Sequence, residues 1–434
     1  TPAENGPSAS LARSLLPAAY AAIRLSRRSL AGLRNHQVML DVVANDIANV
    51  STIGFKSSTT VFSDVLTQTL QGAGAPASTN AGTNPSQIGL GARLAGTIQS
   101  FTQGAIQRTG RSTDLAIQGD GFLVVEMNGE QMYTRNGALT RDAAGNLATV
   151  DGMLVQGWQS DVTGGINTSG PIGPVQIRVG DLLQPNQTQN VTLGGNLSAD
   201  AAIGTTTMRT LTANDSLGAP LPINLTFTKS AANQWTVTGT YGQSNTAVAI
   251  TDNVLTFDGA GELTGPADRN MNIGAGLIPG YPAAMVLDLG GAATPGRVTQ
   301  FSGETTAAVT EQDGFAAGTL QAFDISPDGV IVGSYSNGRA RAIGQVAMAV
   351  FTNPEGLERA AGSWRQTANS GLAQVGVAGA GGRGLLSSGT LEMSNVDLAE
   401  EFTRLIVAQR GFQGNARVIT TADEVLQEVV NLRR

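Results

Sequence analysis

The chain has 434 residues, more than one ordinary hydrophobic core holds, so a multidomain protein is expected. Charged residues make up only 14% and glycine contributes 56, a composition typical of short strands, tight turns and surfaces that pack against copies of themselves. The net charge of -7 and pI near 4.9 offer no basic patch that would displace counterions, which excludes a nucleic-acid partner.

The N-terminal part predicts a disordered extension followed by a helix. Residues 1–28 are rich in Pro, Ala and Arg and show no apolar pattern that would pair with another element. We expect them to be disordered. Residues 29–50 carry apolar side chains at spacings of three and four, which predicts an amphipathic helix with a narrow stripe. The stripe residues are Leu30, Leu33, Leu40, Ala44 and Ile47, of which Leu33, Leu40 and Ile47 are the predicted assembly contacts.

Residues 51–95 are interpreted as a linker, because their middle (71–86) consists of small, polar and turn-forming residues and is expected to be mobile. From about 96 to 386 the pattern predicts β structure, with alternating residues as in 224–227 and turn signals such as Asn128–Gly129 and Asn337–Gly338. The glycine-rich stretch 376–389 is expected to be a second flexible linker.

A second helix is predicted after Ser394, the expected N-cap, with Asp397 three residues later closing a capping box. Gln409 and Asp423 occupy core-type positions on this helix and are candidates for fixing its register. Its apolar stripe includes Phe402, Leu405, Phe412, Ile419 and Leu426, the predicted assembly contacts. We therefore predict a mainly β protein whose N- and C-terminal helices pair as a coiled coil, with the β domains inserted between them.

No catalytic, cofactor or metal site is predicted. The chain has no cysteine, which excludes disulfides, thiolate ligands and a cysteine nucleophile, and His36 is its only histidine. Residues 379–384 match G-x-G-x-x-G but lack a preceding strand and a following helix, and a loop starting at Asp324 lacks the final calcium-binding carboxylate.

Membrane insertion and a cleaved signal peptide are not expected either. No run approaches the roughly 18 apolar residues of a membrane helix. Pro17 and Arg24 interrupt the only stretch that invites comparison with a signal peptide, so export by a route without a cleaved Sec signal is expected.

Residues 45–56, NDIANVSTIGFK, closely resemble the NNIAN-x-x-T-x-GFK signature of the rod and hook family of bacterial flagellar axial proteins. The matching positions are Asn45, Ile47, Ala48, Asn49, Gly54, Phe55 and Lys56, and Asp46 stands where the family usually has Asn. Residues 112–122, the Tyr133–Gly137 turn and residues 394–410 also match, and the resemblance covers about 29–185 and 312–434.

The resemblance implies nested domains. Residues 29–50 and 390–434 would form an inner coiled coil, 51–95 a connecting region, 96–185 with 312–389 a middle β domain, and 186–311 an outer inserted β domain. Within the family, the length of the chain is similar to that of the hook members. A distal rod protein is the alternative interpretation. A secreted β-rich adhesin is the alternative outside the family.

The function implied is structural, not enzymatic. Family members leave the cell unfolded through the flagellar export apparatus and polymerise into a curved tube, a universal joint between motor and filament. The implied partners are further copies of the chain and the rod, hook cap and hook–filament junction proteins, and the implied location is the extracellular flagellum. The two apolar stripes are the expected contacts between subunits.

Overall fold

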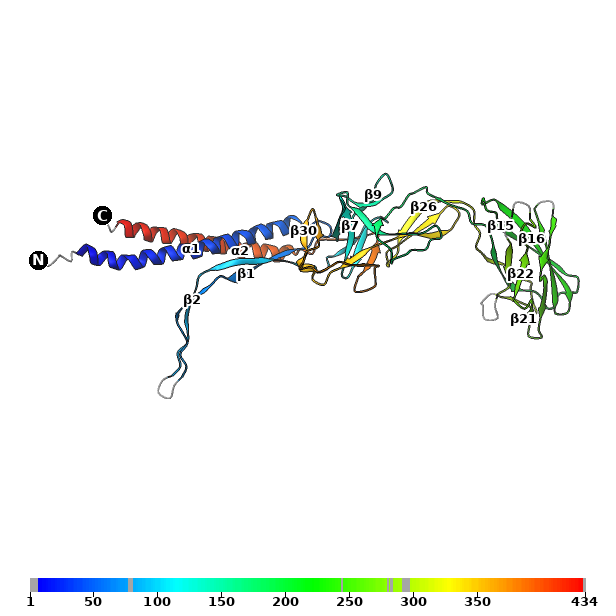
Figure 1. Ribbon diagram of the computed structural model, residues 1–434, viewed down its shortest axis with the longest axis horizontal. Coiled ribbons are helices and arrows are strands. Elements are labelled where there is room, and N and C mark those ends of the chain that lie inside the picture. The colour runs from blue at the N-terminus through cyan, green and yellow to red at the C-terminus, as the bar shows by residue number, and fades with distance from the viewer. Residues whose placement is uncertain are drawn as a thin grey trace. The chain divides into compact units, whose positions relative to one another are not determined.

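Figure 1 shows the computed structural model, which describes residues 7–76, 81–242, 245–278, 281, 284–290 and 297–431. Each end of the chain forms one long helix, α1 (Pro7–Ala48) and α2 (Leu398–Asn431), and strands dominate the rest. The predicted class, mainly β with the β structure inserted between two paired helices, is confirmed.

The first helix is longer than predicted. Residues 7–28, expected to be disordered, belong to α1, while residues 1–6 lie outside the described residues. Pro7 stands in the first turn, where its missing N–H is not needed. The following Ala, Leu and Arg residues are strong helix formers, and Pro17 does not end the helix.

The predicted linker at 51–95 is a long β-hairpin. β1 (Ser58–Asp64) pairs antiparallel with β4 (Ala92–Gln99), and β2 (Thr67–Gln71) pairs antiparallel with β3 (Ser86–Gly89). Of the segment expected to be mobile, residues 77–80 lie outside the described residues. Asn35 of α1 donates a hydrogen bond to the Ala92 carbonyl at 3.0 Å, so the hairpin contacts the first helix.

The described residues divide into two compact units. Unit 1 contains the chain up to Ile177, Asp324–Val332 and the chain from Ala342 onward. Unit 2 contains Arg178–Phe323 and Gly333–Arg341, and is therefore larger than the expected insertion at 186–311. The strands that contain residues of both units are β26 (Gly318–Ile325), β27 (Val330–Tyr335) and β28 (Ala340–Val346).

The β part of unit 1 packs around an aromatic core. The ring centroids of Phe122 and Trp364 lie 5.4 Å apart, and those of Tyr133 and Phe351 lie 4.7 Å apart in a T-shaped contact. The expected Asn128–Gly129 turn joins β7 to β8, with positive φ at both residues. Besides the hairpin, its strands are β5 (Ile106–Arg108), β6 (Leu115–Gln118), β7 (Phe122–Met127), β8 (Glu130–Thr134), β9 (Leu139–Arg141), β10 (Leu147–Thr149), β11 (Leu154–Gln159), β12 (Gly173–Pro174), β29 (Met348–Val350), β30 (Glu358–Ala360), β31 (Ser363–Arg365), β32 (Gln374–Gly376), β33 (Leu385–Ser388) and β34 (Thr390–Glu392), with a short 3-10 helix at Pro354–Gly356.

The chain passes between the helices and this β region twice, and the two passages pair with each other. β5 pairs antiparallel with β34, and β6 pairs antiparallel with β33. The glycine-rich stretch after β32 is held in place and is not the free linker expected. Gly384 N–H donates to the Asp120 carbonyl at 2.7 Å, and Arg383 Nε donates to the Val377 carbonyl at 2.7 Å.

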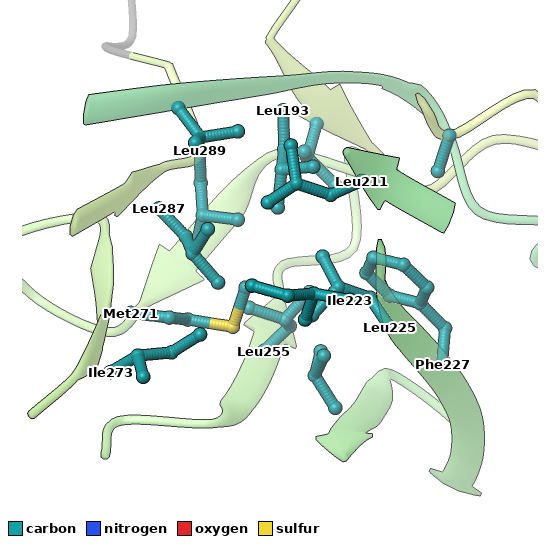
Figure 2. Close-up of a cluster of buried hydrophobic side chains, with 14 of the residues drawn as sticks. Leu193, Leu211, Ile223, Leu225, Phe227, Leu255, Met271, Ile273, Leu287 and Leu289 are labelled. Carbon is teal, nitrogen blue, oxygen red and sulfur yellow. The ribbon is translucent and has the colours of Figure 1, made fainter. Parts of the chain in front are cut away.

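Unit 2 is a sandwich of two sheets around one apolar core. One sheet has the strand order β15-β16-β17-β20-β21 and the other β19-β22-β23-β14-β24, with β25 on β14 and β18 on β17. Figure 2 shows side chains of both sheets directed toward one another, including Leu225 and Leu287. Its strands are β13 (Leu182–Leu183), β14 (Asn190–Asn196), β15 (Thr206–Asn214), β16 (Pro220–Ala231), β17 (Gln234–Tyr241), β18 (Thr246–Val248), β19 (Ile250–Thr251), β20 (Val254–Phe257), β21 (Leu263–Gly265), β22 (Asn270–Ile273), β23 (Met285–Asp288), β24 (Val298–Thr299) and β25 (Ala308–Gln312).

The second helix begins later than predicted. Asp397, not Ser394, is its N-cap, since Asp397 Oδ1 accepts hydrogen bonds from the N–H groups of Ala399 (2.8 Å) and Glu400 (3.3 Å). Asn395 explains the delay: it accepts from Ser57 N–H at 2.8 Å and donates to the Ser100 carbonyl at 2.8 Å, which holds the chain outside the helix.

Candidate functional site

The terminal helices α1 and α2 lie side by side and run antiparallel (Figure 1). Gly32 of α1 faces Asn415 of α2, and one turn further along α1 His36 faces Gly411. Around these contacts, buried or small residues recur at spacings of three, four and seven on both helices. We call this set the seam: Ser29, Gly32, His36 and Val43 on α1, and Ala408, Gly411, Asn415 and Ala422 on α2.

The predicted apolar stripes lie beside the seam rather than in it. On α1 the stripe is offset from the seam by about one residue. Leu33, Leu40 and Ile47 are half-buried, and Leu30 and Ala44 are exposed. On α2 four members are half-buried, Leu405, Phe412, Ile419 and Leu426, and Phe402 is 50% exposed. The seam closes the pair, and the stripes, which were predicted to contact other subunits, flank it.

Several large apolar side chains on the paired helices are exposed. Leu30 is 43% exposed on α1, and Ile406 and Val407 are 50% and 56% exposed on α2. An exposed apolar surface that exceeds scattered single residues is a mark of a protein-binding face. The predicted register residues Gln409 and Asp423 are exposed and lie outside the seam.

The signature at 45–56 ends α1 and turns the chain toward the β region. Asn45 and Ala48 are exposed, while Asn49 Nδ2 donates to the Asn45 carbonyl at 2.8 Å and its Oδ1 accepts from Thr52 Oγ1 at 3.0 Å. Gly54 has φ 69°, and a Cβ there would lie 2.6 Å from the carbonyl carbon of Arg135. Glycine is therefore required at position 54.

Phe55 and Lys56 anchor this turn in the protein interior. Phe55 is 2% exposed and lies under the Arg359 guanidinium, 4.4 Å from the ring centroid. Lys56 is fully buried, and its Nζ donates to Glu392 Oε1 and to the Thr102 carbonyl, each at 2.7 Å. Desolvation lowers the pKa of Lys56, and the bond to Glu392 opposes that shift.

Glu392 is the centre of this buried charge cluster. Besides Lys56, it binds Arg135 Nη1 through Oε2 at 3.3 Å and accepts from Gly104 N–H at 2.9 Å. The cluster therefore joins the signature, the Tyr133–Gly137 turn and the last strand before α2. The sequence showed two of these motifs separately, but it carried no signal that Glu392 would connect them.

A pair of buried carboxyl groups, Asp46 and Glu401, continues the seam toward this cluster. Asp46 is 1% exposed and accepts from Ser58 N–H at 2.9 Å; Glu401 is 3% exposed and binds Arg404 Nη1 at 3.1 Å. Desolvation raises the pKa of both carboxyl groups, and the positive charge of Arg404 opposes the shift in each. Arg359 also faces Asp46.

The contacts described so far hold α1, α2 and the β region of unit 1 together. Within the described residues, no three His, Asp or Glu side chains come together as a metal site would require. In the same part of the chain, neither helix is long and apolar enough to cross a membrane. The buried charges of Lys56, Arg135 and Glu392 pair with one another and hold elements together, and several apolar side chains of α1 and α2 are exposed.

Comparison with known proteins decides the family. The family model "Flagellar hook protein FlgE/F/G D1 domain" matches residues 116–200, "Flagellar basal body protein FlaE D2 domain" matches 183–315, and "Flagellar basal body rod FlgEFG protein C-terminal" matches 387–432. The flagellar hook protein FlgE of Borreliella burgdorferi is 38% identical, over 93% of this chain and 98% of the relative. This chain belongs to the FlgE flagellar hook protein family.

Other FlgE proteins match over the same extent. The protein of Treponema pallidum is 37% identical, over 93% of this chain and 98% of its own length, and that of Escherichia coli is 34% identical, over 94% and 99%. The crystal structure of Helicobacter pylori flagellar hook protein FlgE2 is similar with a TM-score of 0.49 and 13% identity, over 64% of this chain and 98% of that one. The D2 match at 183–315 falls within unit 2 as the structure defines it.

Proposed function

We propose that this FlgE family member is the structural subunit of a bacterial flagellar hook and polymerises into a curved, flexible tube. The tube would act as a universal joint that transmits torque from motor and rod to the filament. The observation that carries the proposal is the apolar surface that the paired helices α1 and α2 leave exposed, including Leu30, Phe402, Ile406 and Val407. Further copies of the same helices would cover this surface.

The proposed setting follows from this role. The subunit would leave the cell through the flagellar export apparatus without a cleaved Sec signal and assemble outside it, in contact with the rod, hook cap and hook–filament junction proteins. It has no enzymatic, nucleic-acid-binding or membrane-spanning role in this proposal. The relatives are named hook proteins, and the match covers nearly their whole length. This favours a hook subunit over a distal rod protein or an adhesin.

Seeded elongation tests the proposal. Purified chain is added to short hook fragments, and electron microscopy measures the added length. Phe402→Asp is expected to abolish elongation, because a carboxylate at this exposed stripe position would be desolvated against apolar neighbours in the polymer. Gln413→Asp adds the same charge at an exposed polar position of the same helix and should elongate normally.

The melting temperature of the β structure shows whether a variant affects assembly or folding. Both variants should melt at the wild-type temperature, since neither position contributes to the β cores. Elongation by Phe402→Asp at the wild-type rate would show that the exposed stripe is not a subunit contact.

A further inference from the structure

The seam between α1 and α2 contains two reciprocal interlocks. A Cβ on Gly411 would lie 2.4 Å from Cε1 of His36, and a Cβ on Gly32 would lie 2.9 Å from both Nδ2 and Oδ1 of Asn415. Each helix therefore contributes one glycine and one larger polar side chain, and each side chain occupies the space that the opposite glycine leaves. The helices can approach this closely only because both glycines lack a Cβ.

The interlocks discriminate between registers in a way that leucine stripes do not. If α2 slides by one turn in one direction, Gly411 faces Gly32 and leaves a void, while His36 meets the side chain of Val407. If it slides by one turn in the other direction, His36 and Asn415 collide. Of these three registers, only the observed one places a larger polar side chain against each glycine without a void or a collision, whereas similar apolar side chains would pack at several registers.

We propose that the His36–Gly411 and Asn415–Gly32 interlocks fix the register of α1 against α2 and thereby position the apolar stripes for a second copy of the chain. This inference rests on the proposed self-assembly. It assigns to these four residues the role that the sequence suggested for Gln409 and Asp423, both of which are exposed. The four seam residues are positioning residues, and the stripes beside them make the contact.

A glycine-to-alanine series tests the proposal, because helix propensity and the interlock predict opposite signs. Alanine is the better helix former at any exposed or neutral position. Gly414→Ala is the matched control, since a Cβ at Gly414 meets nothing within 4 Å and lies three residues from Gly411. We expect Gly411→Ala to slow seeded elongation at least about tenfold, and Gly414→Ala to leave it unchanged or faster.

A compensating variant identifies the cause. In Gly411→Ala with His36→Ala, the imidazole that the new Cβ would strike is removed, and elongation should recover to within about threefold of wild type. Rescue of this kind is expected of an interlock and not of a glycine required for helix flexibility.

The register itself is measured by a distance between two spin labels in the full-length chain. Because the chain has no cysteine, Arg34→Cys and Gln413→Cys, both at exposed positions, introduce the only two attachment sites. The observed register places these two positions at the same level of the pair. Labelled chain is measured alone and, diluted with unlabelled chain, after addition to hook fragments. A single narrow distance is expected, and Gly411→Ala should shift or broaden it.

The outcomes separate the two proposals. An unchanged distance and a wild-type elongation rate in Gly411→Ala would overturn the interlock, as would equal damage from Gly414→Ala. If no form of the chain elongates hook fragments but Gly411→Ala still disturbs the distance, the interlock stands and the proposed self-assembly fails.

Discussion

At the scale of single residues, the molecule depends on a few buried charges that bind one another. Glu392 receives hydrogen bonds from Lys56, Arg135 and the Gly104 backbone, and all three charged side chains are at most 3% exposed. Removing one member of a buried charge network leaves its partners uncompensated. The cost is therefore set by the charges that remain, not by the contact that is lost.

Glu392→Ala should destabilise unit 1 by about 3–5 kcal/mol, because the Lys56 and Arg135 cations would stay buried without a counter-charge. Urea unfolding of the full-length chain measures the loss. The control is Glu130→Ala, which removes the ion pair between Glu130 and Arg365. Because these side chains are 50% and 43% exposed, the variant should lose less than about 1 kcal/mol of stability. Equal effects of the two variants would contradict a special role for the buried cluster.

The buried carboxyl pair gives a pH dependence of the opposite sign to ordinary ion pairs. Burial raises the pKa of Asp46 and Glu401 in the folded chain, so between the ordinary carboxyl pKa and the raised one the native state binds more protons than the unfolded chain. The free energy of unfolding contributed by these groups therefore increases as pH falls through that window, and decreases as pH rises through it.

Asp46→Asn keeps an oxygen that can accept the Ser58 N–H and removes the buried charge. The variant should melt at a higher temperature than wild type at pH 7, and the difference should shrink as the pH is lowered toward about 4. Circular dichroism of the helices during thermal unfolding at several pH values measures this. A variant less stable than wild type at pH 7 would show that the charged form of Asp46 is favourable.

At the scale of elements, the sequence predicted the existence of both terminal helices and missed how they meet. The apolar stripes were visible because Leu, Ile and Phe dominate any hydrophobic pattern. Apart from Val43, the seam consists of Ser, Gly, His, Asn and Ala, whose heptad spacing is present in the sequence but carries almost no hydrophobic signal. The hairpin at 58–99 was missed for a related reason: its tip has the composition of a linker, and pairing across such a distance has no local signature.

The outer part of that hairpin should be the first site of proteolysis. β2 and β3 are exposed along their whole length and pair only with each other, and a two-stranded ribbon is marginally stable in water. Subtilisin should cut within 71–86 before it cuts the β cores of unit 1 or unit 2. Mass spectrometry of the fragments identifies the sites. The stretch 376–384, also rich in glycine, is the internal comparison and should resist because hydrogen bonds to Asp120 and Val377 hold it. Early cleavage at 376–384 would contradict this.

At the scale of the whole molecule, the motifs predicted the nested order of segments but not where unit 2 closes. The resemblance was weak over 186–311. The predicted end at 311 excludes residues that close unit 2 by hydrogen bonds to its beginning. Asn186 and Phe315 exchange two backbone hydrogen bonds of 3.0 and 2.9 Å, and the Asp313 carboxylate accepts from the N–H groups of Gln189 and Asn190. These bonds connect residues about 125 positions apart, which no local pattern specifies.

A fragment of residues 186–315 should therefore fold alone and unfold cooperatively, because its apolar cluster lies entirely within 191–309. A fragment ending at 311 loses Asp313 and Phe315 and should be less stable by about 2–4 kcal/mol. Dispersed NMR spectra and urea unfolding of both fragments measure this. If the two fragments were equally stable, the closure at Asn186 and Phe315 would have no energetic role.

The double passage of the chain between the helices and the β region has a mechanical consequence. A single connecting strand can swivel about its own φ and ψ bonds, so it transmits pull but little twist. Here β5 and β6 leave the helical end beside β34 and β33, which return to it, and hydrogen-bonded ladders join the two passages. Rotating one end against the other would shear both ladders and the salt bridges of Glu392 at once. The paired passages therefore resist torsion at the point where the helices of unit 1 meet its β structure.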